Sequence, residues 1–118
     1  MLAHGAVLLR SGIFTNEQVN AIARDYRQAG LPPAEVAMMA FAEQVTARAN
    51  TVTREDVEGL RGHGFSDTEI LDIALTAAAR CFFSKVLDGV GALPDHEYEH
   101  KLEPELRDAL TVGRPIAG

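Results

Sequence analysis

The segment His96-Glu97-Tyr98-Glu99-His100 has the residue types and the spacing that can hold a catalytic zinc ion. Residues four apart share one face of a helix, so both imidazoles would coordinate the metal and Glu97 would act as the general base. Such a site needs a buried helix and a third ligand. This segment instead follows a glycine-containing break that ends near Pro94, and it lies among charged residues. A solvated acidic segment is the favoured interpretation, and a zinc hydrolase using His96, Glu97 and His100 stays an alternative.

Cys81 is the one cysteine of the chain, and it lies inside an expected helix between Arg80 and Phe82. One cysteine forms neither an intrachain disulfide nor a cysteine-based zinc site. A reactive thiolate needs a helix N-terminus or a cationic neighbour, and Arg80, adjacent in sequence, does not face Cys81 on a helix. We therefore expect Cys81 to pack as a small hydrophobic residue. Peroxidase activity from this single thiol is a weaker hypothesis.

A third candidate is the stretch Leu60-Arg61-Gly62-His63-Gly64-Phe65, which precedes a capped helix. The order of helix, Gly-Phe loop and helix is similar to that of ubiquitin-associated domains, which are binding modules and not enzymes. Those domains are short three-helix units, whereas the helix expected after Phe65 runs for five or six turns. The simpler interpretation is a tight turn between helices with Phe65 inserted into the core.

The elements that would position these residues are helices, because helix signals are frequent and strand signals are nearly missing. Capping boxes are expected where helices start at Thr15, Thr53 and Ser66, and Pro32-Pro33 suit the first turn of another helix. A long helix is expected over about 67–88; its middle is apolar on most sides, which predicts a central, buried position. A short helix is expected near 103–110. The length favours one all-α domain over residues 1–118, folded as a compact multi-helix bundle.

Charge and hydropathy exclude several classes of function. Acidic residues outnumber basic ones by 17 to 11, which gives a net charge of −6, and no basic cluster is present. We therefore expect neither nucleic acids nor anionic membrane surfaces as partners, because they are bound through basic residues. Charges interrupt every apolar stretch before roughly 18 residues, which excludes a membrane span. No secretory signal is visible at the start, so we expect a cytoplasmic location.

Two stretches together resemble the peroxidase-related branch of the alkylhydroperoxidase D / carboxymuconolactone decarboxylase superfamily. The longer covers residues 31–95, with the core VTREDVEGLRGHGFSDTEILDIAL, and the tail LTVGRPI at 110–116 matches the branch's C-terminus. The shorter is HGAVLLR at 4–10, which is similar to the residues that follow the family's redox motif. The resemblance covers nearly the whole chain. It implies the all-α bundle of the alkylhydroperoxidase D-like type, with the 67–88 helix at its centre.

The resemblance also implies a site, because active family members carry Cys-x-x-Cys-x-x-x-His, usually with a glutamate upstream. There one thiolate is oxidised by peroxide to a sulfenic acid, which condenses with the second thiol to a disulfide. Aligning HGAVLLR places His4 on the motif histidine, the proton relay, and places the second cysteine just before Met1. Both cysteines and the glutamate are missing. The chain thus resembles a family member without its first third, and Cys81 lies on a different helix from the motif.

The function expected from the resemblance is that of a peroxidase-related, antioxidant protein that is redox-silent as given. The alternative is a non-enzymatic helical binding or oligomerisation module, of which the ubiquitin-associated type is one version. The resemblance implies a homo-oligomer, a trimer or hexamer, and no cofactor. Without the leading helices, we expect Leu8, Leu9 and Phe14 to be exposed, and oligomerisation to cover them.

Overall fold

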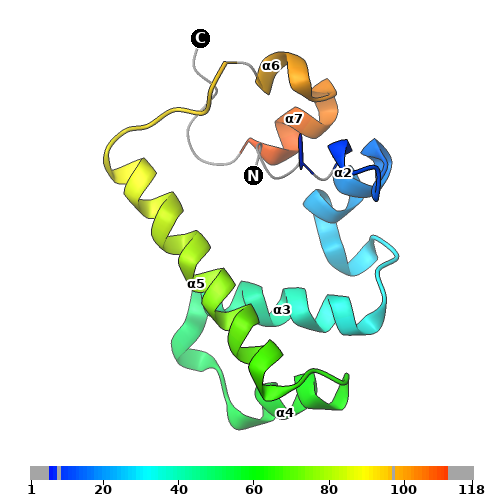
Figure 1. Cartoon of the computed structure of the whole chain (residues 1–118), viewed down its shortest axis with the longest axis vertical. Helices are drawn as coiled ribbons and strands as arrows, with labels where there is room; N and C mark the ends of the chain where they lie inside the picture. Colours follow the sequence, from blue (N-terminus) through cyan, green and yellow to red (C-terminus); the bar gives the residue numbers. More distant parts are fainter. Residues whose placement is uncertain (1–5, 8, 97, 112–118) are drawn as a thin grey trace. The chain divides into compact units, whose positions relative to one another are not determined.

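The computed structural model describes residues 6–7, 9–96 and 98–111, and every regular element within these ranges is a helix (Figure 1). The predicted all-α class is confirmed. Residues 6–7 and 9–10 are helical. The further elements, in chain order, are α2 (Asn16–Asp25), η1 (Tyr26–Gln28), α3 (Pro33–Arg48), η2 (Ala49–Thr51), α4 (Arg54–Gly62), α5 (Asp67–Gly89), α6 (Tyr98–Lys101) and α7 (Pro104–Leu110).

Side-chain caps fix where three of the helices begin, as the sequence predicts. Thr15 accepts a hydrogen bond from the Gln18 backbone and forms a capping box with it at the start of α2. Thr53 forms the equivalent box with Asp56 before α4. Each box satisfies backbone N–H groups that have no partner inside the helix. Helix α3 begins instead at Pro33, whose missing N–H costs nothing in a first turn.

The chain divides into two compact units, one of residues 31–86 and one of the described residues before 31 and after 86. The core of the 31–86 unit contains Phe41 from α3, Leu60 from α4 and Ile70 from α5. Partly buried side chains surround these three: Ala37, Val45, Val52, Val57, Phe65, Ile73 and Ala74. Three short helical faces therefore meet in one small core. The single domain expected over 1–118 stays a prediction.

The other unit is built on α2 and α7, which come from opposite ends of the chain and pack against each other. Its buried residues are Val19, Leu102, Leu106 and Leu110, and an ion pair joins Arg24 of α2 to Glu105 of α7. The expected exposure of Leu9 and Phe14 is wrong. Both side chains are partly buried against this core, because α7 folds back to cover them. Leu8 lies outside the described residues.

Helix α5 has the predicted length, but the burial expected for its middle is wrong. Only Ile70 and Ala77 are buried on it, with Ile73 and Ala74 half-buried beside them. Leu71, Leu75 and Phe82 are exposed. One side of α5 packs on the core of the 31–86 unit, and apolar residues on its other side are exposed.

Candidate functional site

The residues predicted to carry chemistry are not gathered into one site. His4, the histidine assigned by resemblance, lies outside the described residues, as do Glu97 and the tail from Val112 to Ile116. His96 and His100 are both exposed. Within the part of the chain that the structure describes, no three His, Cys, Asp or Glu side chains lie close enough to hold a metal ion.

The helical spacing required by the zinc pattern is not formed around His96. Helix α6 begins only at Tyr98, so His96 lies in the turn before it and His100 lies within it. The His96 Nδ1 atom is 3.3 Å from the Asp95 carboxylate, its neighbour in sequence. His100 lines an open pocket together with Arg10, Asn16 and Glu103, and His96 is not among the residues that line it. The two imidazoles therefore do not share a helix face.

Cys81 is half-buried in α5 and unpaired with any second thiol, since the chain has no other cysteine. At 100° per residue, its position follows Ile70, Ala74 and Ala77 along the side of α5 that packs on the core. This placement agrees with the prediction that Cys81 packs as a small hydrophobic residue.

The turn between α4 and α5 has the geometry of a Schellman motif. Gly64 adopts a positive φ of 94°, and its N–H donates to the Arg61 carbonyl at 2.9 Å. The Phe65 N–H donates to the Leu60 carbonyl at 3.2 Å, and Phe65 and Leu60 belong to the same core. The prediction of a tight turn with Phe65 inserted into the core is confirmed. The Gly-Phe pair thus has a structural role at this turn.

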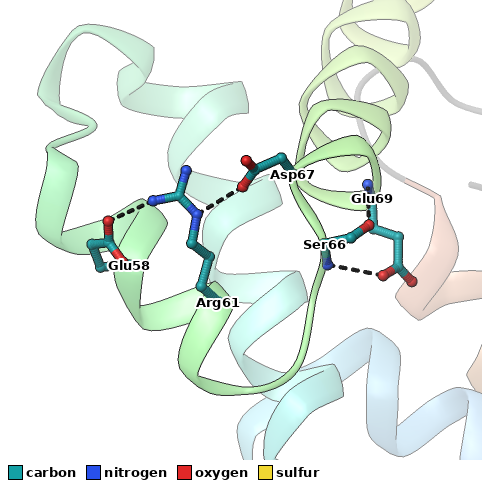
Figure 2. Close-up of polar contacts among 5 residues, drawn as sticks. All are labelled: Glu58, Arg61, Ser66, Asp67 and Glu69. Atoms are coloured by element: carbon teal, nitrogen blue, oxygen red, sulfur yellow. Dashed lines mark hydrogen bonds and ion pairs between the residues drawn. The ribbon is translucent and has the colours of Figure 1, made fainter.

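Polar side chains hold the start of α5 against the end of α4 (Figure 2). The Arg61 guanidinium lies between two carboxylates: its Nε donates to Asp67 at 2.7 Å, and its Nη1 donates to Glu58. The hydrogen bond and the charge of Asp67, followed by the charge of Glu58, raise the pKa of Arg61. Because these groups are exposed, the ion pairs contribute little free energy to folding. Their role is to orient the start of α5 relative to α4.

The first turn of α5 carries the third predicted capping box, which is also confirmed. The Ser66 backbone N–H donates to Glu69 Oε1 at 2.9 Å, and the Glu69 N–H donates to Ser66 Oγ at 3.1 Å (Figure 2). The Ser66 backbone and then its hydroxyl hydrogen-bond the carboxylate, which lowers the pKa of Glu69. These contacts fix the residue at which α5 begins and hence the faces that its side chains occupy.

A second polar cluster joins α3 to the start of α4. Asp56 Oδ2 accepts hydrogen bonds from the Thr53 backbone at 2.8 Å and from the Gln44 amide at 3.2 Å. The Thr53 backbone, then the Gln44 amide and the Thr53 hydroxyl lower the pKa of Asp56. The Gln44 amide also donates to the Thr51 hydroxyl at 3.2 Å, so the cluster links α3 to the start of α4.

An apolar groove lies between α3 and α5 within the 31–86 unit, with a volume of about 490 Å³. Its lining residues include Met38 and Met39 from α3 and Ile73, Asp72 and Arg80 from α5. Glu43 also lines the groove, and among the described residues no group of three His, Cys, Asp or Glu side chains is placed to hold a metal ion there.

The largest unexplained feature is the exposed side of α5. We define its outer face as the residues that lie within about 100° on the helix surface and point away from the core: Leu71, Leu75, Ala78, Ala79, Phe82 and Val86. Leu71 and Leu75 are each 57% exposed, Phe82 is 73% exposed and Val86 is 48% exposed. Phe83, 59% exposed, lies at the edge of this face. Such a continuous apolar surface is typical of an interaction site.

Sequence reasoning missed the outer face although a signal for it was present. The apolar residues of α5 form two helical stripes, one through Ile70 and Ala77 and one through Leu71 and Leu75. Two apolar stripes indicate a helix whose two sides are both packed against other residues. They do not indicate whether the residues that pack on the second stripe belong to the same chain.

The chain matches no protein-family model, no curated protein and no solved structure. Among the described residues, none of the helices combines the length and the apolar character needed to cross a bilayer.

Proposed function

We propose that this chain is a helical association module of the alkylhydroperoxidase D-like, peroxidase-related type, and that it has no thiol peroxidase activity as given. The outer face of α5 is the observation that carries the association. Four large apolar side chains there, Leu71, Leu75, Phe82 and Val86, are about half exposed or more. Covering one such side chain is worth roughly 1.5–3 kcal/mol when burial is complete, so a partner on this face gains a substantial free energy.

The way α5 is anchored supports the same proposal. Its first turn is fixed by the Ser66–Glu69 box and by the pair between Arg61 and Asp67. Its core-facing side packs through Ile70 on Phe41 and Leu60. A helix held in this way presents its outer face in one orientation, which lowers the entropy lost when a partner binds.

The absence of peroxidase activity is proposed from the thiol inventory. Peroxide oxidises a thiolate to a sulfenic acid, and a second thiol must resolve it to a disulfide before a reductant restores the pair. Cys81 is the only thiol in the chain, and it is half-buried on the core-facing side of α5. The resemblance assigns the proton relay to His4, and the cysteine pair of the family motif is not in this sequence. The family assignment and a cytoplasmic location stay predictions.

Two measurements test these two parts of the proposal. Light scattering from 1 to 100 µM should show a mass that rises above the 12.7 kDa of one chain; a single-chain mass throughout would contradict association. Consumption of hydrogen peroxide in the presence of a thiol reductant should be equal for the native chain and the Cys81→Ser variant. A higher turnover by the native chain would contradict the redox-silent part and favour a single-cysteine peroxidase.

A further inference from the structure

The outer face of α5 has the same pattern in both directions along the helix. Its residues are 71, 75, 78, 79, 82 and 86, and the steps between them are four, three, one, three and four. Reversing the helix about the point midway between Ala78 and Ala79 therefore exchanges Leu71 with Val86 and Leu75 with Phe82. In an antiparallel two-fold pair centred at this point, each residue of the face therefore lies level with another apolar residue of the same face in the second copy.

We propose that the outer face of α5 binds the same face of a second copy of this chain in an antiparallel, two-fold symmetric pair centred between Ala78 and Ala79. This inference rests on the proposed association and names its partner. A two-fold interface uses one surface twice, so each contact made by one residue recurs in the other copy. Heterologous contacts between different faces do not require the pattern to be reversible.

The sizes of the side chains fit this pairing from the centre to the ends. Two alanines of each copy meet at the centre, where small side chains let the helix axes approach closely. On either side, Leu75 is level with Phe82 of the second copy, and further out Leu71 is level with Val86 of the second copy. Large side chains thus meet on either side of the central alanines.

The charges along the same stretch are compatible with the reversal. The charged residues beside the outer face are Asp72 and Lys85, and the reversal exchanges these two as well. Each end of the pair therefore carries one acidic and one basic side chain. A parallel pair would place the two Asp72 carboxylates at one level and the two Lys85 ammonium groups at another, which brings like charges together.

The length of the face sets the expected strength. Residues 71–86 span about 22 Å of helix at 1.5 Å per residue. The contact of one helix pair of this length lies at the small end of specific interfaces. We therefore expect a dimer that dissociates on dilution, in contrast to the trimer or hexamer implied by the family resemblance.

Disulfide crosslinking of single-cysteine variants tests the direction and the register. Two variants carry Leu71→Cys or Val86→Cys, each in a Cys81→Ser background so that no other thiol is present. In the proposed pair, position 71 of one copy lies about 22 Å along the axis from position 71 of the other, far beyond the 4.4–6.8 Å between Cα atoms that a disulfide spans. Positions 71 and 86 of different copies lie side by side.

The expected result, at concentrations where the native chain is dimeric, is a covalent dimer from an oxidised 1:1 mixture of the two variants. Mass spectrometry should show the mixed 71–86 bridge at least tenfold above either homodimer. Homodimers from the separate variants would indicate a parallel pair and overturn the inference. A two-chain mass without the mixed bridge would also overturn it while leaving the proposed association intact. A single-chain mass for the native protein would contradict both the antiparallel pair and the proposed association.

Discussion

Replacement of Leu60 by alanine tests the packing that holds α5 in place. Leu60 is 3% exposed and lies in the core between Phe41 of α3 and Ile70 of α5. Removing a buried leucine side chain costs about 2–5 kcal/mol, with the larger values where the surroundings cannot collapse into the cavity. Leu60 meets side chains from three helices that two polar clusters hold in place, so little collapse is expected.

The loss is large relative to the stability of the unit that contains Leu60. A compact unit of 56 residues, 31–86, rarely gains more than about 3–5 kcal/mol from its core. Leu60→Ala should therefore remove most of that stability. Urea unfolding followed by far-UV circular dichroism gives the size of the loss. Hydrogen exchange locates it, and exchange should accelerate in α3, α4 and α5.

Leu93→Ala is the matched control, because the same side chain there is 51% exposed and lies outside the regular helices. Its unfolding midpoint should stay close to that of the native chain. A Leu60→Ala loss below about 1 kcal/mol, or equal to the loss from Leu93→Ala, would refute the described core.

Further predictions concern the turn before α5 and the capping boxes. Gly64→Ala should destabilise the chain by about 1 kcal/mol, because an L side chain is strained at a φ of 94°. Gly62→Ala, a helical position with open space around it, should be neutral or stabilising in the same urea titration. Acid should destabilise the fold through Glu69 and Asp56, whose pKa values are lowered from 4.5 and 3.8 respectively. Their contribution is complete above these unfolded-state values and is lost as the pH falls through the lower folded-state values. In thermal unfolding scans between pH 2 and 6, Glu69→Gln should flatten the acid limb, and an unchanged slope would contradict the role of the Ser66–Glu69 box.

Much of the fold was predictable because its signals are local. Caps such as Thr53 with Asp56, and the positive-φ glycine before Phe65, act over three to six residues, so the sequence alone indicates them. The length of α5 follows from the Ser66 cap and the glycines after it.

The arrangement of the core was not predictable in the same way, because it depends on contacts between distant parts of the chain. The ion pair between Arg24 and Glu105 joins residues 81 positions apart. Leu9 and Phe14 likewise pack against a cluster that includes residues of α7, far along the chain. Propensity and periodicity carry no information about such pairings. Periodicity also counts an apolar stripe as buried, which is why the outer face of α5 was expected inside the molecule.

Among the candidate site residues, only the packing roles were predictable from the sequence. The packing role of Phe65 and the half-buried position of Cys81 agree with the sequence interpretation. The zinc pattern failed because its spacing requires a helix through residue 96, and α6 begins two residues later. The proton-relay role of His4 stays a prediction.

Sedimentation equilibrium of two matched variants tests the association through α5 most directly. Leu75→Glu puts a carboxylate in the outer face, and Leu93→Glu makes the same change at a similarly exposed position elsewhere. Burying two unpaired carboxylates in the pair should raise the dissociation constant by at least about a hundredfold. The native chain and Leu93→Glu should pass from 12.7 kDa to twice that mass as the concentration rises, while Leu75→Glu stays at 12.7 kDa. Equal association of all three proteins would contradict pairing through the outer face of α5.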